Sequence, residues 1–90
     1  MRAERRKRNP NEPDMAIAHL IVDNAGPSRR TEVETDRRRF IGRGRSLTTA
    51  AAFEPGAQLS GADGFTLDPV IALRRVVRVP AGKKVKVIFW

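Results

Sequence analysis

The sequence predicts a mainly β fold, an antiparallel partial β-sandwich with a C-terminal β-hairpin and a long irregular loop in its middle. Residues 15–22 form an apolar stretch of strand length, and the TEVET segment at 31–35 combines threonine and valine, which favour extended backbone. The C-terminal third alternates apolar and basic residues on either side of a turn signal. Because a chain of 90 residues buries only about 60–65% of its unfolded surface, we expect one modest core.

The first element is a basic, proline-containing lead at residues 1–14, followed by a domain at 15–90. Pro10 and Pro13 each remove a backbone donor and restrain the preceding residue toward extended geometry, so we expect coil with an extended approach. Residues 15–22 are apolar apart from His19 and carry no helix-capping pattern. Such a stretch is typical of a strand buried on both faces.

A turn and a second strand come next. Residues 23–30 are rich in residues that form turns, and TEVET at 31–35 predicts a short strand that stops near Asp36. The turn-forming residues are Asn24, Gly26, Pro27 and Ser28.

Residues 36–46, with the sequence DRRRFIGRGRS, are predicted to form a shaped loop pinned by Phe40. Gly42 and Gly44 flank Arg43 and permit backbone angles that other residues avoid. The spacing lacks both the third glycine of a dinucleotide loop and the lysine of a P-loop, so we reject a phosphate-binding glycine loop.

The remainder divides into an irregular tract and a hairpin. Residues 47–69 mix alanines with glycines and prolines and show no sustained period, which predicts a long irregular crossing. Residues 70–79 and 84–89 alternate apolar and basic positions, and residues 80–83 supply the turn between them. The alternating apolar residues are Ile71, Leu73, Val77, Val79, Val85, Val87 and Phe89.

The composition excludes several kinds of site. No cysteine is present, so neither a disulfide nor a thiolate metal site can form, and His19 alone cannot build a histidine cluster. We therefore predict no metal and no cofactor. The apolar stretches fall far short of the ~20 residues that a membrane-spanning helix requires, and no signal-peptide pattern follows the basic start. We expect a cytoplasmic location with no membrane segment in this piece.

Two separated motifs carry a family resemblance. ETDRRRFIGRGRS at 34–46 and LSGADGFTLDPVIAL at 59–73 together resemble the N-terminal sandwich domain of the cellobiose phosphorylase-like glycosidases. The resemblance covers nearly the whole chain apart from residues 48–57, and within that family it is most similar to the phosphorylase-like region of cyclic β-1,2-glucan synthases. It implies a fragment of a supersandwich domain.

This resemblance also implies what lies outside the chain. In the family the sandwich precedes a helical barrel that carries the general-acid carboxylate and a phosphate pocket, so we expect no turnover from this chain alone and leave open whether it serves an enzyme. The implied partners are a glucan or oligosaccharide bound through the parent protein, inorganic phosphate in the missing barrel, and the missing catalytic domain itself. The family sandwich is longer, so we expect truncation at both ends, and the parent protein would sit on the cytoplasmic side of an inner membrane.

The same resemblance points to a carbohydrate-facing or barrel-docking loop and to no catalytic residue. Arg43 is the leading candidate for a sugar or interface contact, because a guanidinium donates several hydrogen bonds in one plane. The loop residues that match the family motif are Asp36, Arg37, Arg39, Phe40 and Arg43.

A small basic nucleic-acid-binding module is the alternative. The formal charge of +8 and the pI near 11.5 favour it, but the basic residues are dispersed, no tyrosine is present and no recognition-helix pattern appears. We therefore disfavour nucleic acid as a partner. Structural roles are expected for the remaining candidates, with His19 buried, Asp63 and Asp68 in turns, and Phe65, Phe89 and Trp90 in the core rather than in a sugar-stacking platform.

Overall fold

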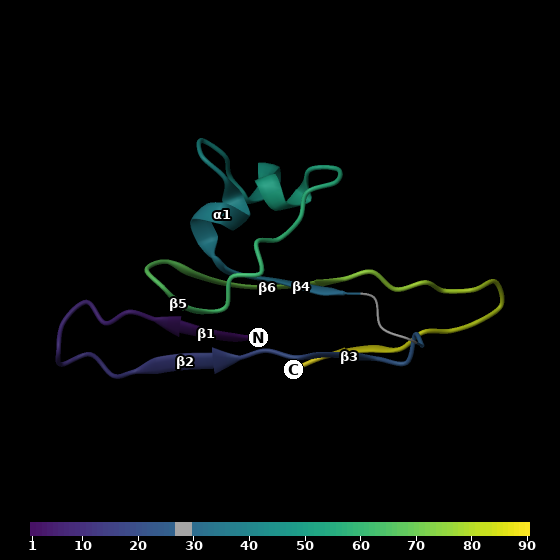
Figure 1. Ribbon diagram of the computed structural model, residues 1–90, viewed down its shortest axis with the longest axis horizontal. Coiled ribbons are helices and arrows are strands. Elements are labelled where there is room, and N and C mark those ends of the chain that lie inside the picture. The colour runs from purple at the N-terminus through teal and green to yellow at the C-terminus, as the bar shows by residue number, and fades with distance from the viewer. Residues whose placement is uncertain (27–29) are drawn as a thin grey trace.

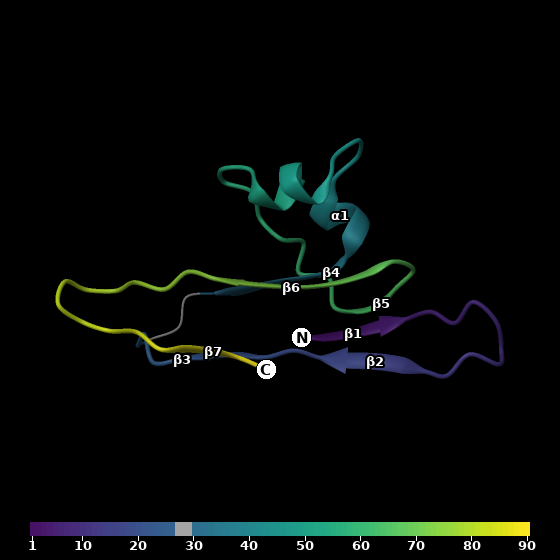
Figure 2. The same ribbon diagram turned by 180° about the vertical axis from the view of Figure 1, so that it is seen from behind.

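The computed structural model describes residues 1–26 and 30–90 and has extents of 54 × 29 × 18 Å. Figure 1 shows two layers of extended chain, with a short helical region standing on the outer side of one layer, and Figure 2 shows the same arrangement from behind. The elements are β1 (Arg2–Arg5), β2 (Met15–Ala18), β3 (Ile21–Asp23), β4 (Thr31–Asp36), α1 (Arg37–Ile41), the 3₁₀ turns η1 (Leu47–Thr49) and η2 (Ala51–Phe53), β5 (Gly64–Thr66), β6 (Pro69–Arg75) and β7 (Val87–Phe89).

The strands form three small sheets. One has the order β2-β1-β5, and the other two are the pairs β3-β7 and β4-β6. All pairs are antiparallel except β1 with β5, which is parallel. The predicted mainly β, antiparallel fold is confirmed, and so is the strand at TEVET, which is β4 and ends at Asp36 as expected.

Residues 15–23 form one extended segment that pairs with β1 in its first half, as β2, and with β7 in its second half, as β3. His19 exchanges two backbone hydrogen bonds of 2.9 Å with Met1, and Leu20 exchanges two of 2.9 Å with Trp90. Neighbouring residues of a strand direct their backbone groups to opposite edges, so β1 and β7 lie on opposite edges of this segment. Figure 1 shows both chain ends beside it.

Two predictions for the N-terminal part are wrong. Coil was expected throughout residues 1–14, but Arg2–Arg5 forms the central strand β1, because pairing with β2 and β5 outweighs its charged composition. The apolar stretch at 15–22 was expected to be buried on both faces, yet Met15, Ile17 and Leu20 are each about half exposed. An apolar run is buried only where other elements cover both faces. The division of the chain at residue 14 stays a prediction.

The C-terminal strands are present, but their predicted pairing with each other is wrong. β6 pairs with β4, and β7 pairs with β3 in the other layer. The predicted turn does form, since the Lys83 amide donates to the Pro80 carbonyl at 3.0 Å. Of the turn residues predicted at 23–30, Pro27 and Ser28 lie outside the described residues.

The core is thin. Ala3, Ala50 and Ala52 are the buried hydrophobic residues of the part that the structure describes, and Glu34 and Thr35 are the buried polar ones. Phe65, Phe89 and Trp90 were expected in the core and are instead mostly exposed, because no layer covers them. Among the described residues, no helix has the length and apolar character needed to cross a membrane.

The middle tract is irregular, but hydrogen bonds attach part of it to β4. The Gly61 amide donates to the Val33 carbonyl at 2.9 Å, the Ser60 amide donates to the Glu34 carboxylate at 3.1 Å, and the Thr35 hydroxyl donates to the Ala62 carbonyl at 3.2 Å. Residues 57–62 therefore run beside β4 as a fixed segment. The predicted long crossing also holds η1, η2 and β5.

Candidate functional site

The predicted loop at 36–46 begins with one turn of helix. Asp36 caps α1, because its carboxylate accepts a hydrogen bond of 2.9 Å from the Arg38 amide. Gly42 ends the helix at φ 85°, and its amide donates to the Arg38 carbonyl at 2.9 Å. A side chain at position 42 would place its Cβ only 2.9 Å from the Cβ of Ala51, so the glycine lets α1 approach η2 closely.

Phe40 pins this segment as predicted. Its ring meets the ring of Phe53 edge to face, with centroids 5.5 Å apart and planes at 85°. This is a favoured geometry for an aromatic pair. The contact fixes α1 against η2, and Figure 1 shows this helical region projecting from the β4-β6 layer.

The five predicted residues lie on the projecting segment 36–43 but differ in their contacts, and Phe40 packs inward against Phe53. Arg37 faces Asp68 at 3.6 Å, and Arg39 faces Asp36 at 3.7 Å. Arg43 is exposed, in the turn after α1. The structure thus brings Asp36, Arg37, Arg39 and Phe40 into a braced unit and leaves Arg43 extended toward solvent.

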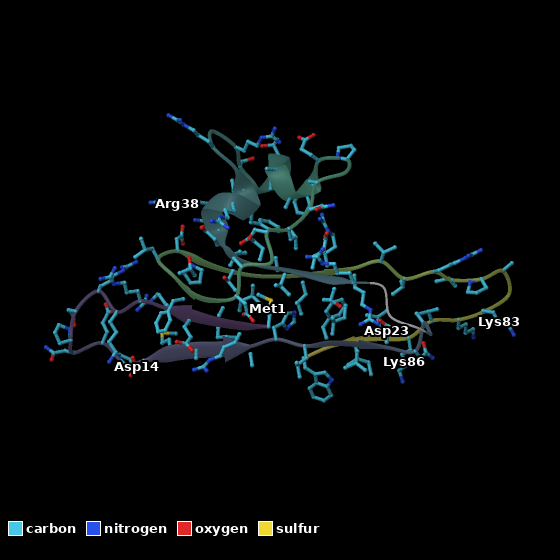
Figure 3. The ribbon with its side chains drawn as sticks, in the orientation of Figure 1. Met1, Asp14, Asp23, Arg38, Lys83 and Lys86 are labelled. Atoms are coloured by element: carbon cyan, nitrogen blue, oxygen red, sulfur yellow. The ribbon has the colours of Figure 1, made fainter. Side chains whose placement is uncertain are left out.

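Two shallow grooves border this unit and share Arg38 and Asp68. The smaller, of about 350 Å³, is lined by Arg37, Arg38, Ile41, Gly42, Arg43 and Asp68. The larger, of about 490 Å³, is lined by Arg6, Asp36, Arg38, Phe65, Thr66, Leu67 and Asp68. Figure 3 shows Arg38 on the outer side of α1.

The larger groove contains residues that the sequence did not assign to the site. Arg6, Phe65 and Asp68 come from segments far apart in the chain, which meet because β1 pairs with β5 and β4 pairs with β6. The sequence analysis had considered Phe65 for sugar stacking but placed it in the core, and the family motif at residues 59–73 was the other signal. Asp68 had been assigned to a turn alone, and the structure adds its ion pair with Arg37.

Some arginine side chains form ion pairs with carboxylates, whereas others have no such partner among the described residues. Arginine ion pairs engage most carboxylates, for example Arg45 with Glu54 at 2.6 Å. Within residues 1–26 and 30–90, no ion pair is found for Arg6, Arg38 or Arg43. The grooves therefore combine free guanidinium donors with the carboxylate acceptors of Asp36 and Asp68, an arrangement that can hydrogen-bond hydroxyl groups.

Two other predicted residues have structural contacts elsewhere. His19 is half-buried rather than buried, and its Nδ1 donates to the Trp90 carbonyl, since a carbonyl oxygen can only accept. Its ring also stacks on Phe89, with centroids 6.2 Å apart. Asp63 accepts a hydrogen bond of 2.7 Å from the Arg2 amide. Neither residue lies in the grooves.

Comparison with known proteins gives two matches. The family model for the glycosyl hydrolase 94 supersandwich domain matches residues 1–90. The chain is also similar to the cyclic beta-(1,2)-glucan synthase NdvB of Rhizobium meliloti (strain 1021), with 70% identity over 86 residues. The aligned part is 96% of this chain and 3% of that relative, so the chain spans a small fraction of the relative's length.

Proposed function

Because the chain belongs to the glycosyl hydrolase 94 supersandwich domain family, we propose that it is a scaffold segment of a protein that acts on β-linked glucans. The parent would be of the cyclic β-1,2-glucan synthase or phosphorylase type, as the similarity to NdvB indicates. In this proposal the α1 surface faces carbohydrate or docks the catalytic domain.

One observation carries the surface assignment. The proposal is supported by the bracing of the 36–46 segment, where the Phe40–Phe53 contact and the Asp36 cap hold α1 in place. Arg43 extends from this segment without an ion partner among the described residues. The braced α1 segment supports the backbone beside Arg43, and its guanidinium, which has no ion partner among the described residues, is free to donate to a ligand or a partner surface.

The chemistry of glucan processing would reside elsewhere in the parent protein. We propose that a separate barrel supplies the general acid and binds inorganic phosphate, and that this chain alone has no turnover. A cytoplasmic location of this segment also forms part of the proposal.

A titration of the 90-residue chain with cyclic β-1,2-glucan tests the carbohydrate role. We expect saturable binding that changes little between low and moderate salt, and we expect Arg43→Ala to weaken it about threefold or more. Arg78→Ala, at an exposed arginine outside the grooves, is the matched control and should leave the affinity unchanged.

Duplex DNA in the same titration tests the nucleic-acid alternative. The proposal would be overturned by DNA affinity with a steep salt dependence and no glucan response, because that slope reports counterion release from phosphates. Glucan binding without an effect of Arg43→Ala would overturn the assignment of Arg43.

A further inference from the structure

Phe65 is exposed because no layer covers it, and its side chain lies in a groove among charged side chains. Its side chain is 75% exposed, the largest value among the exposed large hydrophobic residues of the described chain, and the nearby Leu67 is 68% exposed. Both line the larger groove together with Arg6, Arg38 and Asp68. A single exposed apolar residue is ordinary, but an apolar patch rimmed by polar groups, as Phe65 and Leu67 form with the charged residues of this groove, is typical of a contact site.

Backbone hydrogen bonds hold the walls of this groove. The Arg6 amide donates to the Thr66 carbonyl at 3.3 Å, and this joins the end of β1 to the end of β5. The Arg37 amide donates to the Asp68 carbonyl at 3.0 Å, and this joins α1 to the start of β6. The groove residues are therefore positioned by four elements before any ligand arrives.

The mixture of groups in the groove selects the class of ligand. Phe65 offers an aromatic face, the guanidinium groups of Arg6 and Arg38 donate hydrogen bonds, and the carboxylates of Asp36 and Asp68 accept them. A phosphate or another polyanion would use only the donors and would lie against the two carboxylates. A sugar ring can interact with all of these groups. Its apolar face can stack on the Phe65 ring, and its hydroxyl groups can accept from the guanidinium groups and donate to the carboxylates.

We propose that the groove lined by Arg6, Arg38, Phe65 and Asp68 is a saccharide subsite, in which Phe65 stacks on a glucosyl ring of a neutral glucan. Arg38 and Asp68 hydrogen-bond the hydroxyl groups of that ring. The volume of about 490 Å³ lies within the range of about 300–1,000 Å³ typical of small-molecule sites. This subsite rests on the proposed carbohydrate role and names residues outside the predicted loop set.

The test is an NMR titration of the ¹⁵N-labelled chain with cyclic β-1,2-glucan. We expect amide shifts to concentrate at residues 64–68 and at Arg6 and Arg38. Phe65→Ala should weaken binding roughly fivefold or more, and Phe65→Leu should weaken it too, since leucine keeps apolar volume but has no ring face. Phe65→Trp should retain binding.

Phe89→Ala is the matched control, because Phe89 is also exposed, at 59%, and lies on β7 outside the groove. Its affinity should stay within about twofold of the unmodified chain. Equal binding by the unmodified chain, Phe65→Ala and Phe65→Leu, or shifts that avoid residues 64–68, would overturn the subsite and leave the broader carbohydrate role standing. Absence of any glucan binding by the unmodified chain would overturn both.

Discussion

The guanidinium of Arg74 lies against the carboxylate of Glu32 across the β4-β6 pair, with Nε and Oε2 2.6 Å apart. Two further nitrogens of Arg74 donate to the carbonyls of Ala52 and Ala57. One side chain on β6 thus holds η2 at Ala52 and the following segment at Ala57.

Arg74→Lys tests this connection. Lysine keeps the charge but cannot reach a carboxylate and two carbonyls in one plane, so we expect the free energy of unfolding to fall by about 1–2 kcal/mol. Urea unfolding followed by circular dichroism measures the change, and Arg78→Lys at an exposed position serves as the control. Equal midpoints for the two variants would contradict the assigned role.

Glu34→Gln tests the buried carboxylate. Glu34 is 2% exposed and accepts hydrogen bonds from the Asp36 amide at 3.0 Å and the Ser60 amide at 3.1 Å. Glutamine has one acceptor oxygen, so one amide would face an NH₂ group, and we expect a loss of about 1–3 kcal/mol. Faster hydrogen exchange should accompany it at Ser60 or at Asp36, whichever amide faces the NH₂ group. A variant as stable as the original chain, with both amides still protected, would show that the carboxylate is not needed.

Gly42→Ala and Gly44→Ala form a matched pair. Both glycines have positive φ, at 85° and 69°, but only a Cβ at position 42 would meet the Cβ of Ala51, whereas nothing lies within 4 Å of one at position 44. We expect a loss of about 1 kcal/mol at position 44 and of about 2 kcal/mol or more at position 42. Thermal unfolding measures both values. The close approach of α1 to η2 would be refuted by equal losses.

Asp23→Asn tests the contact between the two layers. Asp23 on β3 has a side chain that is 1% exposed, and its Oδ2 lies 2.6 Å from Nε of Arg75 on β6, an ion pair whose angle does not satisfy hydrogen-bond geometry. Figure 3 shows Asp23 between the layers. Removing the charge leaves the mostly buried Arg75 unpaired, so we expect a loss of about 3 kcal/mol. Restored stability in Asp23→Asn combined with Arg75→Leu would support this cause, and an unaltered midpoint in the single variant would contradict it.

Local sequence was enough to predict strands where the backbone preference is intrinsic. TEVET forms β4 and stops at Asp36, where the side chain that ends the strand also caps α1. The turn at 80–83 was predicted for the same reason, since Pro80 and Gly82 act on their own backbone. Strand partners were not predictable in this way, because β6 and β7 have alternation that suits several neighbours.

Local sequence also identified part of the candidate site, whose function stays a prediction. The motif at 36–46 identified the projecting segment, and its aromatic anchor Phe40 does what the sequence indicated. Arg6 was not assigned to the site, and Phe65 was considered for sugar stacking but placed in the core, because their positions depend on the parallel pairing of β1 with β5, which no local pattern specifies. Aromatic residues near a strand are usually covered, so the exposure of Phe65 also had no signal in the sequence.

The change of hydrogen-bonding edge between His19 and Leu20 brings the two ends of the chain close enough for a circular permutation. Met1 and Trp90 pair with adjacent residues from opposite edges, so two strand spacings of about 4.8 Å place them roughly 10 Å apart. A flexible linker of about six residues spans roughly 13 Å and could join them. New ends could then be opened between Gly82 and Lys83, both exposed. Such a circular permutant should keep the same strand pairings, since every ladder between described strands is retained.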